Sequence, residues 1–384
     1  MSYEKRGVSA AKTEVHAAIK NLDKGLFPNA FCKILPDLVA GDENFCNVMH
    51  ADTAGTKTSL AYLYWRETGD TSVWSGIVQD SIVMNLDDMA CAGITDNIIL
   101  SSTIGRNKNL VTGEVLKVLI GATPEFISRM KEQNIHLTLA GGETADVGDI
   151  VRTADVGFTA FARFPKNEVV DINIKAGDVI VGFASYGQTT YETEYNSGIG
   201  SNGLTFARHE VLSNHYTQNY PESFDPKIEA AYVYTGKNRL TDKFEGYEVG
   251  KLLLSPTRTF VPFIKPLLAN FRGKINGIIH NTGGGQTKVL HFIDKLHIVK
   301  NHLLPVPPVF RLIQSQKDAD WKEMYQVFNM GQRLEVYTDE ASAKQMIELA
   351  KTFNIDAQIT GYVESADSKK VTLHTEQAGE LVYS

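Results

Sequence analysis

The sequence predicts an α/β fold built from two domains, because strand-like and helix-like segments alternate along most of the chain. Short apolar runs typical of strands are followed by longer segments in which apolar residues recur every three or four positions, as they do on one face of a helix. The chain has 384 residues, of which 43% are hydrophobic and 22% are charged. That length and composition are sufficient for two hydrophobic cores.

The first half of the chain begins with a short apolar run that ends at Asp52. In the segment that follows, Ile82, Leu86 and Met89 have helical spacing, and strand-like and helix-like patterns then alternate. We expect strands at 47–51, 97–104, 136–140 and 153–164, and helices at 76–92 and 114–132.

The domain boundary is predicted just after the strand at 153–164. Residues 164–177 are polar and contain a proline and several charges, and they precede the apolar run 178–184. We therefore expect an N-terminal domain over residues 1–168 and a C-terminal domain over residues 169–384.

The second half repeats the mixture of patterns without repeating the sequence. We expect strands at 275–280, 332–338 and 357–363, and helices at 256–270, 286–293, 308–316, 321–329 and 341–354. No low-complexity tract or short-period repeat interrupts this alternation.

The composition favours a soluble cytoplasmic protein that acts on small molecules. The formal net charge of -7 disfavours general binding to nucleic acid or to a membrane surface. The N-terminus is too charged for a signal peptide, and no apolar run has the length of a membrane span. The three cysteines show no CxxC spacing, so we expect reduced thiols and neither a disulfide framework nor a structural zinc site.

Residues 51–57 read ADTAGTK and contain the glycine, hydroxyl and lysine of a phosphate-binding loop. They do not form a Walker loop, because Thr56 separates Gly55 from Lys57 and no glycine lies five positions before Gly55. Asp52 indicates a different arrangement, since a carboxylate repels phosphate oxygens unless a divalent cation lies between them.

Further carboxylates lie on the helix expected after this loop. Asp80 and Asp87 are nearly two turns apart and project from almost the same face, with Asp88 beside them. On an isolated helix such acids are more often a solvated polar face. Asp52 and Glu143, however, occupy strand ends, where α/β sheets bind ligands. Together these oxygen ligands suit Mg²⁺.

Glu143 belongs to the segment AGGETAD at 140–146, whose two glycines permit a tight turn after a strand. Such a turn lets Glu143 face the same cleft as Asp52. An ordinary connection between a strand and a loop is the alternative interpretation.

The ordered motifs of the chain resemble those of the phosphoribosylformylglycinamidine cyclo-ligases, also called aminoimidazole ribonucleotide synthetases. The resemblance extends from about residue 7 to residue 363. It is carried by ADTAGTK at 51–57, QDSIVMNLDDMACAG at 79–93, AGGETAD at 140–146, SNGL at 201–204, SPTR at 255–258, HNTGGG at 280–285 and MYQVFNMG at 324–331.

The resemblance implies a magnesium-dependent ATP enzyme of purine biosynthesis. In this family an N-terminal α/β domain pairs across a homodimer, and the C-terminal domain is an α/β sandwich. The enzymes phosphorylate the amide oxygen of formylglycinamidine ribonucleotide, after which a substrate nitrogen attacks the activated carbon and expels phosphate. Positioning and charge neutralisation are the main requirements of phosphoryl transfer, and carboxylates that hold a metal, together with Lys57 and Thr56, suit them.

Matched position by position, the resemblance assigns roles to residues of both halves. The residues implied in ATP and phosphate binding are Lys20, Thr56, Lys57, Gly142 and Glu143, and those implied in metal binding are Asp52, Asp80, Asp87, Asp88 and Glu143. The residues implied in substrate binding are Asn202, Arg258, Gly283, Gly284, Gly285 and Asn329, and the expected catalytic residues are Asp52, Lys57 and Asn202.

Structural roles are the alternative for several of these residues. Lys20 can be a solvated lysine on a helix over 10–20, and Arg258 can form a surface ion pair. Residues 283–285 lie between a strand and a helix, where they form either an anion-binding nest or a turn that needs only backbone freedom.

The chain departs from the family pattern in ways that concern proton transfer. Gly200 occupies the position of the histidine that commonly precedes Ser-Asn-Gly, and His209, His215 and His280 are replacements by residue type alone. PNAFCK at 28–33 replaces a glycine-rich segment. Two functional alternatives therefore stay open: another ATP-dependent phosphotransferase, such as a selenophosphate synthetase or thiamine monophosphate kinase, and a non-catalytic nucleotide-binding paralogue.

Overall fold

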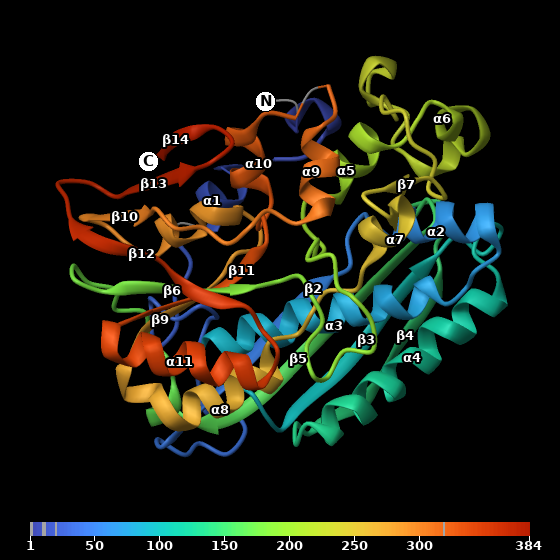
Figure 1. The fold of residues 1–384 in the computed structure, drawn as a ribbon. Helices are drawn as coiled ribbons and strands as arrows, with labels where there is room; N and C mark the ends of the chain where they lie inside the picture. Colours follow the sequence, from blue (N-terminus) through green and yellow to red (C-terminus); the bar gives the residue numbers. More distant parts are fainter. Residues whose placement is uncertain (1–2, 10–12, 20, 318) are drawn as a thin grey trace.

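The computed structural model describes residues 3–9, 13–19, 21–317 and 319–384, and it contains two large sheets with helices packed between and around them (Figure 1). All strands of the first sheet precede residue 166, and all strands of the second follow residue 178. In the described part of the chain no helix is both long enough and apolar enough to cross a membrane.

The first sheet has five strands in the order β1-β2-β5-β3-β4. β3 and β4 are parallel, and the other neighbours are antiparallel. The strands are β1 (Leu35–Pro36), β2 (Phe45–Thr53), β3 (Ile98–Arg106), β4 (Leu137–Asp146) and β5 (Ala154–Pro165).

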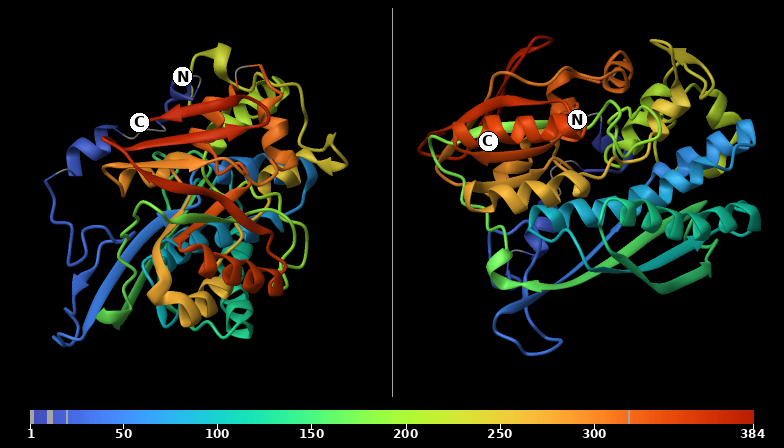
Figure 2. Two further views of the ribbon diagram at one scale, coloured as in Figure 1. Left: turned by 60° about the vertical axis from the view of Figure 1, so that its left-hand side comes forward. Right: turned by 60° about the horizontal axis from the view of Figure 1, so that its bottom comes forward.

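Helices cover only one face of this sheet (Figure 2). They are α2 (Lys57–Thr68), α3 (Val73–Cys91) and α4 (Gly113–Glu132). Alternate residues of β5, such as Phe158 and Ala160, are buried beneath them, as expected for a strand with one covered face. On the other face Met49 is 64% exposed and Ile99 is 42% exposed.

The second sheet has seven strands in the order β14-β13-β10-β12-β6-β11-β9. They are β6 (Val179–Ala184), β9 (Ile275–His280), β10 (Leu296–Lys300), β11 (Gln332–Thr338), β12 (Ala357–Ser365), β13 (Lys370–Thr375) and β14 (Gly379–Tyr383). The helices of this half are α5 (Leu204–Val211), α6 (His215–Asn219), α7 (Val249–Leu254), α8 (Val261–Phe271), α9 (Pro308–Gln314), α10 (Trp321–Val327) and α11 (Glu340–Thr352). α8 and α11 pack together beside β6 and β12 (Figure 1).

Helix α3 joins the two halves. It packs on β2 and β5 of the first sheet and also contacts β9 and α8 of the second half. Its apolar residues therefore occur on nearly every side, unlike those of α4, which has one apolar face. Polar side chains on α3 must consequently find partners inside the protein.

The expected strands and most expected helices occur within a few residues of their predicted positions. The prediction of a helix over 256–270 was wrong at its start, because residues 255–260 form no regular secondary structure and α8 begins at Val261. The helix expected at 286–293 is a 3-10 helix, η6 (Gly285–His291). The elements that the expectations omitted include β1, α2, α5, α6, α7, β10, β13 and β14.

Candidate active site

A cavity of about 200 Å³ brings together four of the motif segments identified in the sequence. It is lined by Tyr3, Ser9, Gly55, Thr56, Ser201, Asn202, Gly203, Leu204, Thr205, Gly283, Gly284 and Val327. Hollows of about 400 and 450 Å³ occur elsewhere, but neither is lined by a predicted site residue. The smaller cavity is therefore the better candidate.

The first wall of the cavity is the turn between β2 and α2. Gly55 has a positive φ of 58°, and Thr56 precedes the first turn of α2. The Thr56 hydroxyl lies 2.8 Å from the Thr205 hydroxyl, so a hydrogen bond connects the first half of the chain to α5. Thr56, a predicted phosphate contact, lines the cavity on this wall.

The second wall is the N-terminus of α5. Gly203 caps this helix with a φ of 77°, and no side chain of the described residues caps it. The unpaired N-H groups and the helix dipole favour an anion at such an end. Oδ1 of Asn202 is buried there without a donor among the described residues, as expected for an atom that binds a ligand.

The third wall is the glycine loop that follows β9. Gly283, Gly284 and Gly285 all have positive φ angles, of 49°, 125° and 50°. Gly283 and Gly284 line the cavity, whereas Gly285 packs against the α10 backbone, where a Cβ would approach the Tyr325 carbonyl oxygen to 2.5 Å. The positive φ of Gly285 and its close contact with the α10 backbone thus explain why this residue is glycine. Gly283 and Gly284 border the space that is open to a ligand.

Lys57 does not reach the cavity, contrary to its expected phosphate contact. It is fully buried, and Nζ donates to Asp80 Oδ1 at 2.8 Å and to the carbonyl oxygens of Gly200 and Ser255 at 3.1 and 2.6 Å. Burial lowers the pKa of Lys57, while the charge of Asp80 acts in the opposite direction. These three acceptors occupy all the hydrogens of the ammonium group.

The acids of α3 also bind within the protein. Asp80 Oδ1 accepts from the N-H and the hydroxyl of Thr257 at 2.7 and 2.6 Å. Asp87 Oδ1 accepts from the Thr259 hydroxyl at 2.8 Å and from the Phe260 N-H at 3.0 Å. Both carboxylates therefore hold the irregular segment 255–260, because α3 is enclosed between the two halves.

Asp88 lies between two histidines. His280 Nδ1 is 2.7 Å from Asp88 Oδ1, and His50 Nε2 is 3.4 Å from Asp88 Oδ2. Burial alone would raise the pKa of Asp88, but both imidazoles bring it well below its usual value. Burial would likewise lower the pKa of His50, yet the bond and charge of Asp88 raise it to about 9.

The five predicted metal ligands do not form one site within this chain. Asp52 pairs across the sheet with Phe158 on the face covered by helices, whereas Glu143 is exposed and shares a row with Thr53 and Thr103 on the open face. Asp52 on β2 and Glu143 on β4 also lie three strand spacings apart across the sheet, about 14 Å. The described residues contain no group of three or more side chains placed to hold a metal.

Glu143 fails to reach Asp52 for a reason of register. β4 continues as a strand through the two glycines to Asp146, so no turn redirects Glu143. Gly142 is exposed in the same strand. A β-bulge in β4, at the register shift with β3 where Gly141 has a φ of 108°, reverses the alternation of side chains, so Glu143 lies on the open face and Asp52 on the covered face.

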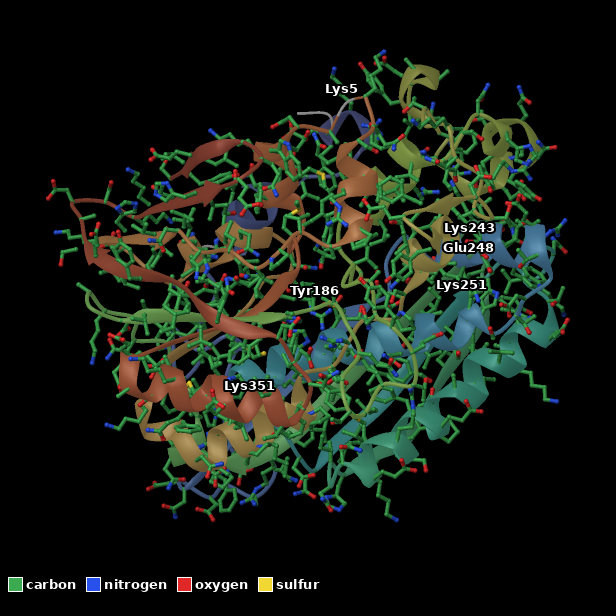
Figure 3. All side chains as sticks on the ribbon, in the orientation of Figure 1. Lys5, Tyr186, Lys243, Glu248, Lys251 and Lys351 are labelled. Carbon is green, nitrogen blue, oxygen red and sulfur yellow. The ribbon has the colours of Figure 1, made fainter. Side chains whose placement is uncertain are left out.

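Arg258 and Asn329 have structural partners. Arg258 is buried and pairs with Glu192 at 2.7 Å while donating to the carbonyl oxygens of Ala184 and Tyr186, the residue labelled just beyond β6 in Figure 3. Asn329 accepts from the Ser185 hydroxyl and donates to the Gly198 carbonyl oxygen. Neither residue lines the cavity. Lys20 lies outside the described residues.

None of the three histidines considered as proton carriers lines the cavity. His280 is buried against Asp88, and His209 Nδ1 accepts from the Tyr234 N-H at 3.2 Å. His215 interacts with Asn219 at the surface. Among the described residues, none of these three histidines therefore takes the place of the family histidine whose position is occupied by Gly200.

The N-terminal segment is the part of the site that the sequence did not reveal. Tyr3 and Ser9 line the cavity, and the Tyr3 N-H donates to Glu323 at 2.8 Å. Arg6 forms a buried ion pair with Glu210 of α5. Figure 3 shows neighbouring Lys5 at the top of the molecule. A charged N-terminus gives no local signal that it folds onto a helix more than 200 residues away.

Comparison with known proteins places most of the chain in one family. A family model described as AIR synthase related protein, C-terminal domain, matches residues 175–374. The phosphoribosylformylglycinamidine cyclo-ligase of Methanocaldococcus jannaschii is 31% identical over 322 residues, which are 82% of this chain and 77% of that protein. The enzyme of that name from Staphylococcus carnosus is 27% identical over 333 residues, covering 85% and 82% of the two chains.

Solved structures share the fold at low sequence identity. PurL of Thermotoga maritima, complexed with ADP, has a TM-score of 0.52 and 12% identity over 97% of this chain and 48% of that chain. The present chain thus spans about half the length of PurL. A chain of a HypE-HypF complex has a TM-score of 0.55 and 14% identity over 97% and 99% of the two chains.

Proposed function

Because the chain belongs to the phosphoribosylformylglycinamidine cyclo-ligase family, we propose that it uses ATP to convert formylglycinamidine ribonucleotide into aminoimidazole ribonucleotide, ADP and phosphate. The observation that carries this proposal is the meeting of four family motifs at one cavity. These are the turn at Gly55 and Thr56, the start of α5, the loop at Gly283 and Gly284, and Val327 of α10.

The cavity suits the phosphoryl transfer step. The amide oxygen of the substrate attacks the γ-phosphorus, and the bond to the bridging oxygen breaks as ADP leaves with the electron pair. Backbone N-H groups at the start of α5 and in the glycine loop are placed to bind the phosphate oxygens. Asn202 Oδ1, which lacks a donor among the described residues, is suited to accept from the amidine nitrogen of the substrate.

Ring closure follows from the activated carbon. A substrate nitrogen attacks that carbon, the bond between carbon and the phosphorylated oxygen breaks, and phosphate leaves with the electron pair. The nitrogen then loses a proton. Lys57, Asp80 and Arg258 contribute by holding the segments around the cavity in place, since Lys57 Nζ donates to Asp80 Oδ1 and to the Ser255 carbonyl oxygen and Arg258 donates to the Tyr186 carbonyl oxygen.

We also propose Mg²⁺ as the companion of ATP. Mg²⁺ commonly binds through one or two carboxylates together with nucleotide phosphates, without a complete set of protein ligands. Asp52 is the best-placed carboxylate, because it is the next-to-last residue of β2 and lies three residues before the cavity turn at Gly55. The remaining predicted ligands are engaged elsewhere or lie on the open face.

Membership of this family supports three further proposals, which concern the roles of the two domains, the cellular location and the oligomeric state. Residues 1–168 form the ATP-binding and dimerisation domain, and residues 169–384 form the domain that binds the ribonucleotide. The enzyme acts in the cytoplasm as a homodimer. The uncovered face of the first sheet, which carries Met49 and Ile99, supports pairing through the N-terminal domain.

The decisive experiment is turnover by the purified protein. Formylglycinamidine ribonucleotide, ATP and Mg²⁺ are supplied, and aminoimidazole ribonucleotide and ADP are measured together. We expect equal amounts of both products. ATP consumption without ring closure would instead support another phosphotransferase of the superfamily, and ATP binding without turnover would support the non-catalytic paralogue.

The role of Mg²⁺ is tested separately by titrating ATP into the protein with and without the metal. We expect binding to be at least about tenfold tighter with Mg²⁺, because the cation shields Asp52 from the phosphate charge. Equal affinities would contradict this role without affecting the proposed reaction.

A further inference from the structure

Ser201 lines the candidate cavity at the start of the α5 wall, and its hydroxyl has one hydrogen-bond partner among the described residues. Its Oγ lies 3.3 Å from Oγ1 of Thr257, which is fully buried in the irregular segment 255–260. Either hydroxyl could donate if this pair stood alone. The other contacts of Thr257 decide the direction of the bond.

The hydroxyl of Thr257 has a single hydrogen, and Asp80 receives it. Oγ1 of Thr257 donates to Asp80 Oδ1 at 2.6 Å, and the Thr257 N-H donates to the same oxygen at 2.7 Å. Asp80 Oδ1 also lies 2.8 Å from Lys57 Nζ, and a carboxylate beside an ammonium group accepts hydrogen bonds. Thr257 can therefore only accept from Ser201, so the Ser201 hydrogen is directed to Thr257.

Ser201 consequently offers lone pairs, and no hydrogen, to a ligand in the cavity. A serine oxygen is only one carbon beyond the backbone, so it stays close to the wall that its residue forms, and Ser201 is partly exposed there. The next residue adds a second acceptor, because Oδ1 of Asn202 is buried without a donor among the described residues. Two adjacent residues of one wall thus present two acceptor oxygens.

We propose that Ser201 is a specificity-determining residue, which together with Asn202 recognises the two nitrogens of the substrate's amidine group. An amidine has a nitrogen on each side of its central carbon and can donate an N-H to each acceptor. The matching amide has an oxygen in one of these two places. That oxygen would meet an acceptor and leave both groups unsatisfied, which disfavours the amide.

Thr257 is a positioning residue in this scheme, because it fixes the Ser201 hydroxyl as an acceptor without touching the ligand. Asp80 and Lys57 fix the orientation of Thr257 in turn. The inference rests on the proposed function, since it assigns to this wall the group that distinguishes the proposed substrate from its amide.

The first test needs no turnover. Formylglycinamidine ribonucleotide and the matching amide, formylglycinamide ribonucleotide, are titrated calorimetrically into the wild-type protein and into Ser201→Ala, without ATP. We expect the wild type to bind the amidine at least about tenfold more tightly than the amide. In the variant this ratio should fall at least about fivefold, because amidine binding weakens. A wild type that binds the two ligands equally, or does not bind the amidine, would overturn the proposal, as would an unchanged ratio in the variant.

Thr257→Val tests the direction of the hydrogen bond. Without an acceptor at residue 257, the Ser201 hydroxyl is free to turn its hydrogen towards the ligand. We expect amidine binding to weaken while amide binding is unchanged or tighter, whereas a loss of packing alone would weaken both. Thr257→Ser keeps the hydroxyl and should retain the wild-type ratio. Equal weakening of both ligands by the valine variant, or a lost ratio in the serine variant, would overturn the proposal.

Ser197→Ala is the matched control for Ser201→Ala. Ser197 belongs to the same segment of chain and is buried, but its hydroxyl donates to the Leu252 carbonyl oxygen at 2.7 Å and it does not line the cavity. This variant should keep the wild-type ratio of affinities. A fall equal to that of Ser201→Ala would assign the effect to a general loosening of the segment and would overturn the specific role.

Failure of the reaction and failure of amidine recognition are distinguishable. A wild-type protein that prefers the amidine through Ser201, but forms no aminoimidazole ribonucleotide, would support the site and contradict the proposed reaction. Normal ring closure with equal binding of the amidine and the amide would have the opposite meaning.

Discussion

At the scale of single residues, charged side chains near the cavity fall into two groups. Lys57, Asp80 and Arg258 are buried with partners inside the protein, whereas Asp52 lies near the end of β2, close to the cavity turn. Removing one member of a buried pair leaves an uncompensated charge and commonly destabilises a protein by about 3–5 kcal/mol. Activity lost on mutating the first group is therefore evidence about stability as much as about catalysis.

Asp52→Asn tests the second group. The amide keeps the shape of the side chain but removes the charge that we propose to hold Mg²⁺ against ATP. We expect the rate of ring closure to fall by about 100-fold or more, equivalent to several kcal/mol of transition-state stabilisation. The measurement is product formation coupled to ATP hydrolysis.

The melting temperature is the control for Asp52→Asn. We expect it to stay close to that of the wild type, because Asp52 is only half-buried. A stable variant with near-normal turnover would contradict the metal role of Asp52.

His50 provides a prediction about pH. Its folded pKa is about 9, raised mainly by Asp88 against the effect of burial, while an unfolded histidine titrates near 6.5. The folded state therefore binds the proton more tightly. The resulting stability, up to about 3 kcal/mol, is fully present below about pH 6.5 and is lost as pH rises through 9.

Chemical denaturation between pH 6 and 10 measures this effect. His50→Gln should lower the free energy of unfolding at pH 6.5 and should show a smaller decline than the wild type as pH rises. Parallel declines in the two proteins would show that His50 is not the group responsible.

At the scale of elements, two helices define the site in different ways. α3 uses its acids to hold the segment 255–260, so it connects the two halves. α5 presents its N-terminus to the cavity, and its position depends on Gly203 packing against Phe328. A helix end can bind an anion only if its backbone approaches closely, which explains a glycine at this cap.

Gly203→Ala should disrupt the start of α5. Its φ of 77° is strained for alanine, and the added Cβ would clash with the Phe328 ring. We expect destabilisation of about 2–4 kcal/mol, from backbone strain and overpacking together, and weaker ATP binding. Thermal unfolding and ATP titration measure the two effects.

Gly246→Ala is the matched control, because Gly246 has a similar φ of 86° but no atom within 4 Å of an added Cβ. It should cost only about 1–2 kcal/mol and leave ATP binding unchanged. Equal losses in both variants would mean that contact with Phe328 contributes nothing.

At the scale of the whole molecule, the first sheet has one covered and one open face (Figure 2). Met49, Phe161 and Ile99 pair in register across β2, β5 and β3, so they form an apolar row on the open face. A broad apolar surface of this kind commonly forms a protein interface. It supports the proposed homodimer.

Met49→Asp combined with Ile99→Asp tests that interface. Two carboxylates on each protomer would have to be desolvated beside their counterparts, so we expect the dimer to dissociate at micromolar concentration. Sedimentation velocity measures the change, and Ile150→Asp, at an exposed residue outside this row, is the control. A wild-type monomer, or a double variant that stays dimeric, would contradict pairing through this face.

Much of the fold follows from local sequence patterns. The strands at β5, β9 and β11 and the helices α3 and α4 lie close to their predicted positions, because the spacing of apolar residues reports which face of an element is buried. The motifs also identify the family. α5 was missed because it is short and follows a glycine-rich turn, so it has too few residues for a clear period.

The partners of polar residues were decided by the tertiary structure alone. Seven-residue spacing correctly places Asp80 and Asp87 near one face of a helix, but it cannot tell whether that face meets solvent, a metal or another segment. Here it meets residues 255–260. Likewise, Asp52 and Glu143 both belong to strands, yet their separation depends on register across the whole first sheet. The spacing of residues along a helix or strand determines on which side of that element a side chain lies. Its hydrogen bonds and its burial depend instead on contacts between segments distant in the chain.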